Sequence, residues 1–227
     1  LMADRAAARG AAFAGIFYRR QFWLLALGLA HAYFIWFGDI LFFYAVVGMI
    51  AYLFRNLSPR TLIIVALAIL PVAMLFAFAG GTYMVDLKAR AEAQIEREAA
   101  GATLTEDEQA VVDEWNEAQP MILQGEDELR EDVAAYTGSN ADAFNHRLKF
   151  LAGFHVEGLL FFILWRVGGL MLIGMALMKL GVLSAAKSNT FYERMMLVSY
   201  GTGVPLCMFS AWALNAQGFD ALWAFRV

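Results

Sequence analysis

The chain has 227 residues and a formal net charge of −4; 61% of its residues are hydrophobic and 17% are charged. A water-soluble domain is usually closer to half apolar and a quarter charged, so this composition argues against one or two soluble domains, which the length would permit, and for a membrane protein. Cys207 is the single cysteine, which excludes an intrachain disulfide.

The first part of the chain contains two apolar runs, Phe22 to about Phe37 and Ile40 to Phe54. One unbroken helix over both runs would be about 50 Å long, which is too long for one ordinary span. A tight hairpin at Gly38 and Asp39 is therefore predicted, with Asp39 capping the returning helix. The chain begins Leu-Met-Ala-Asp with no signal peptide, so we expect it to be a piece of a longer protein.

A third apolar run extends from Thr61 to Met84 and contains no charged residue. Such a segment can satisfy its backbone hydrogen bonds only as a helix inside a bilayer. Ser58 suits the N-cap of this helix and Pro59 its first position.

An acidic stretch follows. Residues 86–147 contain sixteen acidic and five basic residues, a net charge of −11, whereas the rest of the chain carries +7. Thr105 and Glu108 have the spacing of a capping box, and Ser139 can cap a later helix. We therefore expect two to four polar helices in an acidic extramembrane insertion at 85–147. It separates a first membrane part, 1–84, with three spans, from a second, 148–227, with two.

The second membrane part is predicted to cross once from about Leu160 to Leu180 and again from about Met195 to Leu214. This topology places the basic turns at 55–60 and 179–194 on one side and residues 86–147 on the other. Basic turns are typical of the cytoplasmic side, so the acidic insertion is expected to be extracytoplasmic. The predicted fold class is an all-α integral membrane protein with about five transmembrane helices and an acidic helical extramembrane insertion.

Ionisable side chains within the apolar runs form two candidate sites. His31 and Asp39 are a candidate catalytic pair, in which the histidine accepts a proton and the aspartate orients it. Alternatively, His31 bonds between helices and Asp39 only caps the hairpin. His155, Glu157 and Arg166 are candidates for a substrate or ion path. His155 and Arg166 should share a helical face while Glu157 points elsewhere; alternatively His155 and Glu157 lie at the membrane interface and Arg166 pairs with an acid of another helix.

Other chemistries have no support in the sequence. There is no cysteine pair, no HExxH and no GxSxG motif, so neither a metal site nor a serine nucleophile is predicted. No cofactor and no nucleic-acid partner are expected, and the lipid bilayer is the expected surrounding.

Three stretches carry a resemblance to a known family. The first stretch contains four short strings: Tyr18-Arg19-Arg20, Gly28-Leu29-Ala30-His31-Ala32, Trp36-Phe37-Gly38-Asp39-Ile40-Leu41 and Tyr44-Ala45-Val46-Val47-Gly48. The second stretch is Leu57-Ser58-Pro59-Arg60, and the third runs from Gly169 to Gly181. They resemble the YeiB-like family of bacterial multi-pass membrane proteins, a domain of unknown function.

The resemblance implies a middle portion of a longer protein, because members of the family carry further spans on both sides. The family is distantly related to membrane acyltransferases. The resemblance thus implies acyl transfer from a donor such as acyl-CoA to a lipid or glycan acceptor in the bacterial inner (plasma) membrane, with His31 activating the acceptor. The alternative is a non-enzymatic, transporter-like or partner-binding envelope component.

Overall fold

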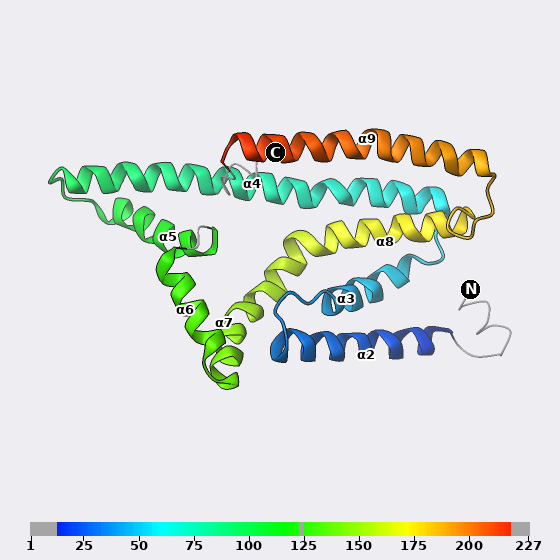
Figure 1. Ribbon diagram of the computed structural model, residues 1–227, viewed down its shortest axis with the longest axis horizontal. Coiled ribbons are helices and arrows are strands. Elements are labelled where there is room, and N and C mark those ends of the chain that lie inside the picture. Colours follow the sequence, from blue (N-terminus) through cyan, green and yellow to red (C-terminus); the bar gives the residue numbers. More distant parts are fainter. Residues whose placement is uncertain (1–12, 123–124, 219–227) are drawn as a thin grey trace. The chain divides into compact units, whose positions relative to one another are not determined.

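The computed structural model describes residues 13–122 and 125–218 (Figure 1). Within these residues the secondary structure is helical throughout and contains no strand, so the all-α prediction is confirmed. The ends of the predicted membrane parts, residues 1–12 and 219–227, lie outside the described ranges.

The chain forms two compact units. One combines residues 1–74 with 136–186, and the other combines residues 75–135 with 187–227. Helix α4 (Pro59–Ala99) runs from the first unit into the second, and the chain returns to the first unit near the end of α6 (Glu126–Thr137). These units follow packing, whereas the boundaries predicted above follow charge and stay a prediction.

A helical hairpin begins the first unit. Helix α2 (Phe13–Phe34) lies beside α3 (Leu41–Ala51), which continues into the 3-10 turn η1 (Tyr52–Phe54) (Figure 1). The hairpin predicted at Gly38 and Asp39 is therefore confirmed. Gly28 permits the close contact of the two arms, because a Cβ atom there would lie 2.4 Å from the backbone nitrogen of Phe42.

Helix α4 begins as predicted and ends later than expected. The backbone N–H of Thr61 donates to the Ser58 hydroxyl at 3.2 Å, and Pro59 is the first helical residue. The helix then continues beyond Met84 to Ala99, into the acidic stretch. Residues 86–99 contain strong helix formers and no glycine or proline, and two i,i+4 ion pairs, Asp86 with Arg90 and Lys88 with Glu92, add a little support.

A single helical run connects the acidic stretch to the second membrane part. It comprises α7 (Asn140–Gly158), the π-helical turn η2 (Leu159–Ile163) and α8 (Leu164–Lys179). Ser139 caps this run through a capping box with Asp142, as the sequence predicts. The run contains one candidate span, Gly153–Lys179, in agreement with the single crossing expected from about Leu160 to Leu180, while the π turn was not predicted.

Helix α8 packs on the first half of α4. Their shared core consists of Leu62, Ala66, Leu172 and Ala176. Gly169 allows this packing, since a Cβ atom there would lie 2.6 Å from the Cγ atom of Leu70.

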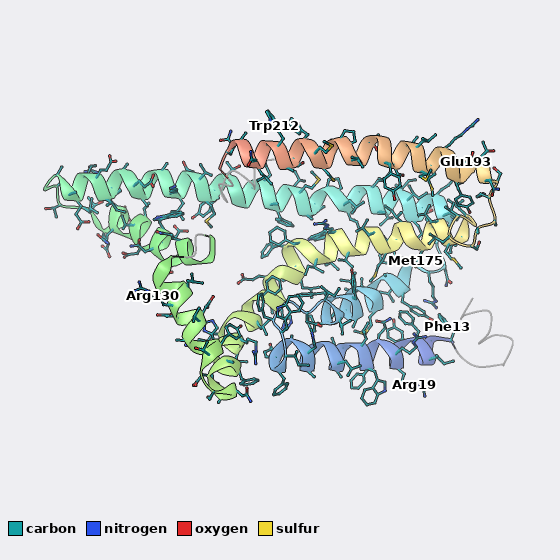
Figure 2. The ribbon with its side chains drawn as sticks, viewed as in Figure 1. Phe13, Arg19, Arg130, Met175, Glu193 and Trp212 are labelled. Carbon is teal, nitrogen blue, oxygen red and sulfur yellow. The ribbon has the colours of Figure 1, made fainter. Side chains whose placement is uncertain are left out.

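The second unit contains the rest of α4, α5 (Glu106–Ile122) and α9 (Asn189–Ala216). Trp115 and Ala118 of α5 pack on Leu87 and Ala91 of α4. The acidic stretch is therefore folded, as predicted. Figure 2 shows Trp212 projecting from α9, where its side chain is exposed.

Three helical segments are long and apolar enough to cross a membrane: Pro59–Ala99, Gly153–Lys179 and Asn189–Ala216. Many of their large apolar side chains are exposed, for example Leu67 and Met74 of α4, which suits a lipid environment and not water. The chain is therefore an α-helical membrane protein by these criteria.

The expected number of about five spans is wrong for the described residues. Helix α3 has 11 residues, about 17 Å, and falls short of a bilayer even with η1 added. Helix α2 is longer, but Arg19, Arg20 and Gln21 lie inside it and leave only Phe22 to Phe34 as an apolar run.

Candidate functional site

The hairpin brings His31 and Asp39 together. His31 lies in the last turn of α2, and its Nδ1 atom is 3.1 Å from Oδ1 of Asp39 in the following turn. The Asp39 side chain is 1% exposed and the His31 side chain 35% exposed. A buried carboxylate therefore holds an imidazole whose ring reaches the surface.

The second oxygen of Asp39 caps the returning helix. Oδ2 accepts a hydrogen bond of 2.9 Å from the backbone N–H of Phe42 in the first turn of α3. A carboxylate at this position satisfies a free N–H group and interacts favourably with the positive end of the helix dipole. The capping role and the orienting role, which the sequence presented as alternatives, are thus compatible, because each uses a different oxygen.

This geometry determines which nitrogen of neutral His31 is basic. An ionised Asp39 can only accept, so Nδ1 carries the hydrogen and donates it. Nε2 then carries the lone pair, and no hydrogen bond among the described residues involves this atom. An imidazole oriented in this way can act as a general base at Nε2 while the carboxylate stabilises the imidazolium form.

His155 joins this pair from α7. It is 7% exposed, and its Nδ1 atom lies 3.3 Å from the Tyr33 hydroxyl. Its ring packs against Phe42 and Phe43, with centroids 4.3 and 5.5 Å away, and the Asp39 carboxylate interacts with it electrostatically. Its Nε2 atom has no hydrogen-bond partner in the described structure. The candidate site therefore holds two histidines near one buried carboxylate.

Glu157 and Arg166 do not join this cluster. Both are exposed, whereas His155 is buried. The expectation that His155 and Arg166 share one face assumed an unbroken α-helix. The π turn at Leu159–Ile163 lies between them and accommodates one more residue per turn, which changes their relative direction by roughly 100°.

Arg147 is a site residue that the sequence analysis missed. It is 8% exposed, and its guanidinium donates to the backbone oxygens of Tyr33 (3.0 Å) and Phe34 (3.4 Å) at the end of α2. A cation here satisfies carbonyl groups that the helix leaves free. Its position as the last basic residue of the acidic stretch is the only signal in the sequence, and nothing local links it to α2.

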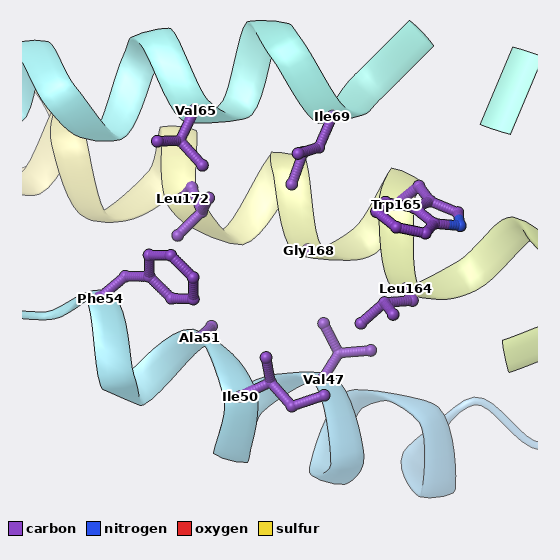
Figure 3. A pocket seen from close by; sticks show the side chains of 10 residues that line it. All are labelled: Val47, Ile50, Ala51, Phe54, Val65, Ile69, Leu164, Trp165, Gly168 and Leu172. Carbon is purple, nitrogen blue, oxygen red and sulfur yellow. The ribbon is translucent and has the colours of Figure 1, made fainter. Parts of the chain in front are cut away.

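An apolar pocket of about 180 Å³ lies beside this cluster in the same unit (Figure 3). Its walls come from α3 with η1, α4 and α8, and Figure 3 shows Ile50, Val65, Ile69 and Leu172 among the side chains that surround it. None of the histidines or Asp39 lines it. The polar cluster and the pocket are thus separate features that share helix α3.

The described residues contain no group of three or more histidine, cysteine, aspartate or glutamate side chains placed to hold a metal ion. The polar side chains that the structure brings together at the site are those of the two histidines, Asp39 and Tyr33.

Comparison with known proteins gives one partial match. The chain is 42% identical over 69 residues to the uncharacterised protein YxaH of Bacillus subtilis (strain 168). The matched segment is 30% of this chain and 17% of that protein, so the chain spans only a small part of its relative. No family model matches the chain, and no solved structure matches it.

Proposed function

We propose that this chain is part of a multi-pass bacterial inner-membrane protein that transfers an acyl group to an envelope acceptor, a lipid or a glycan. The observation that carries the proposal is the 3.1 Å contact between His31 and the buried carboxylate of Asp39. It supplies an oriented base that an acceptor can reach, because the His31 ring is partly exposed.

In the proposed reaction, Nε2 of His31 takes the proton of the acceptor hydroxyl or amine. The acceptor then attacks the carbonyl carbon of a donor such as an acyl-CoA thioester. The new acyl bond forms, the carbon–sulfur bond breaks, and the imidazolium returns its proton to the thiolate. Asp39 favours the imidazolium during the step because its carboxylate remains negative.

Membership in the YeiB-like family is part of the same proposal. Its support is the resemblance of the segments around His31, Ser58 and Gly169, which include both members of the candidate pair. The relative from Bacillus subtilis is uncharacterised and contributes no activity.

The proposed orientation places turns 55–60 and 179–194 in the cytoplasm and residues 86–147 outside. Its support is the charge difference between the acidic stretch and the rest of the chain. The three candidate spans are compatible with this arrangement if α4, α8 and α9 each cross once.

The test is acylation of envelope lipids and glycans in cells that depend on the full-length protein. His31→Gln should abolish transfer, because the amide cannot accept a proton at neutral pH, while the amount of protein in the membrane stays unchanged. Glu157→Gln is a matched control, since Glu157 is exposed and lies apart from the pair. Unchanged acylation in His31→Gln would refute the proposal, and loss of solute uptake instead would support a transporter-like role.

A further inference from the structure

We infer that the apolar pocket between α3, α4 and α8 binds the alkyl chain of the acyl donor. This inference rests on the proposed function and deepens it, because it assigns a binding site to the alkyl chain of the donor, which His31 does not contact in the proposed reaction.

The lining side chains are apolar apart from one indole nitrogen. Trp165 contributes the only polar side-chain atom, and its indole N–H donates to the backbone oxygen of Leu160 at 2.6 Å. The pocket therefore presents no free side-chain hydrogen-bonding group, and a polar ligand would lose its hydration there without compensation. A hydrocarbon chain loses nothing by entering it.

The volume fits part of such a chain. An apolar cavity of about 150 Å³ is large enough for benzene, a molecule of six carbons. The present pocket, of about 180 Å³, therefore holds a segment of roughly six carbons. Because the pocket is open to one side, a longer chain can continue out of it, next to the exposed edge of Ile50.

Helix α3 connects the pocket to the polar cluster. Phe43 packs against His155, and Val47, one helical turn further on, lines the pocket (Figure 3). One turn advances the helix by about 5.4 Å. A donor with its carbonyl at the histidines thus needs only a few methylene groups to bring its chain to the pocket.

The π turn orients the facing wall. Within it, the backbone oxygen of Leu160 accepts a hydrogen bond of 2.6 Å from the Trp165 indole N–H, and the Trp165 side chain lines the pocket. His155 precedes this turn, and Leu164 and Gly168 follow it, so the same helical run faces the polar cluster before the turn and the pocket after it. π turns occur often at functional sites.

Gly168 offers a way to close the pocket. A Cβ atom there would lie 3.7 Å from Val47 Cγ1 and 3.9 Å from Ile69 Cδ1, which are ordinary contact distances. Alanine therefore fits, whereas leucine extends into the pocket. Gly174 of the same helix has nothing within 4 Å of its Cβ position and does not line the pocket, so Gly174→Leu is a matched control.

The experiment uses the detergent-solubilised protein and palmitate that carries a photoreactive diazirine in its chain. After irradiation, labelled peptides are mapped by mass spectrometry, with unlabelled palmitoyl-CoA or phosphatidylglycerol as competitors. We expect adducts on α3 and α8 around the pocket and competition by palmitoyl-CoA at lower concentration than phosphatidylglycerol. Gly168→Leu should reduce this labelling by about tenfold or more, the effect expected from overfilling a packed site.

Three outcomes would overturn the inference: adducts spread over all lipid-exposed helices, equal labelling of Gly168→Leu and wild type, or preferential competition by phosphatidylglycerol, which indicates bilayer lipid only. If Gly168→Leu does not fold, Ile50→Trp is the second variant, because Ile50 lines the pocket and is partly exposed, and labelling of this variant at the wild-type level would count against the pocket. Labelling should persist in His31→Gln, so the binding result is independent of whether acyl transfer occurs.

Discussion

Asp39 bonds to His31 with one carboxylate oxygen and to the backbone of α3 with the other. The histidine orientation and the start of the helix therefore depend on the same buried group. Two substitutions can separate these roles, because asparagine caps a helix about as well as aspartate and alanine does not.

Asp39→Asn should leave thermal stability near the wild-type value and lower acyl transfer. The amide oxygen can still accept from Phe42, but the negative charge that favours protonated His31 is lost. Asp39→Ala should lower both, with a stability cost of about 0.5–2 kcal/mol for the lost cap. Thermal unfolding in detergent and the acylation assay measure the two effects. Equal stability of both variants would contradict the capping role.

Gly28→Ala should destabilise the hairpin. The added methyl group would lie 2.4 Å from the nitrogen of Phe42 and 2.9 Å from Oδ2 of Asp39, so α2 must move away from α3. We expect a loss of about 1–3 kcal/mol, as for an overfilled core. Gly174→Ala is the control. It meets open space and should stabilise α8 by about 0.5–1 kcal/mol.

Arg147→Gln should loosen the end of α2. The substitution removes a buried cation from two backbone carbonyls, and hydrogen bonds to a charged group are each worth about 1.5–3 kcal/mol. A lower thermal midpoint is expected. Arg166→Gln, which alters an exposed arginine, should leave the midpoint unchanged. Equal midpoints for the two variants would show that Arg147 contributes nothing to the end of α2.

Acidification should weaken the junction between α4 and α5. The backbone N–H of Thr105 and the Arg97 guanidinium bond to the Glu108 carboxylate and hold its pKa below the usual value of 4.5. Because the folded-state pKa is lowered, the stabilisation is complete above about pH 4.5 and is lost as the pH falls through the folded-state pKa. Proteolysis near Gly101 as a function of pH measures this. Glu108→Gln keeps a residue suited to the capping box and should remove the pH dependence; a pH dependence that survives in this variant would contradict the assignment.

Single cysteines test the orientation. In a Cys207→Ser background, Ser58→Cys should react with an impermeant maleimide only after the cells are opened, and Thr103→Cys in intact cells. Both positions are exposed, so reagent access reports the side of the membrane. Labelling of both from the same side would refute the proposed topology.

Local signals in the sequence were reliable for this protein. The hairpin at Asp39 and the caps at Ser58, Thr105 and Ser139 each depend on residues within a few positions, and the structure contains them all. The end of α4 was predicted too early. The end of the apolar run at Met84 indicates where the helix can leave the membrane, but polar residues that favour a helix let α4 continue to Ala99.

Contacts distant in sequence could not be predicted in the same way. Tyr33 and His155 are 122 positions apart, and Arg147 reaches the end of α2 from 114 positions away. No periodicity within either segment indicates such a partner. The π turn likewise could not be predicted, because the residues Leu159–Ile163 are apolar and do not differ in type from those of an ordinary apolar α-helix.

The π turn also determines which change of length this part of the chain can absorb. Its five residues occupy one wide turn, so removing one of them would let an ordinary helix form across the junction. The residues after the junction would keep their direction relative to His155, because the wide turn already absorbs one residue more than an α-helical turn. Adding one residue would instead rotate everything after it by roughly 100°, and Trp165 would lose its place opposite α3. An insertion of one apolar residue, neutral for membrane insertion, would thereby uncouple the two halves of the site, whereas a deletion of one would not.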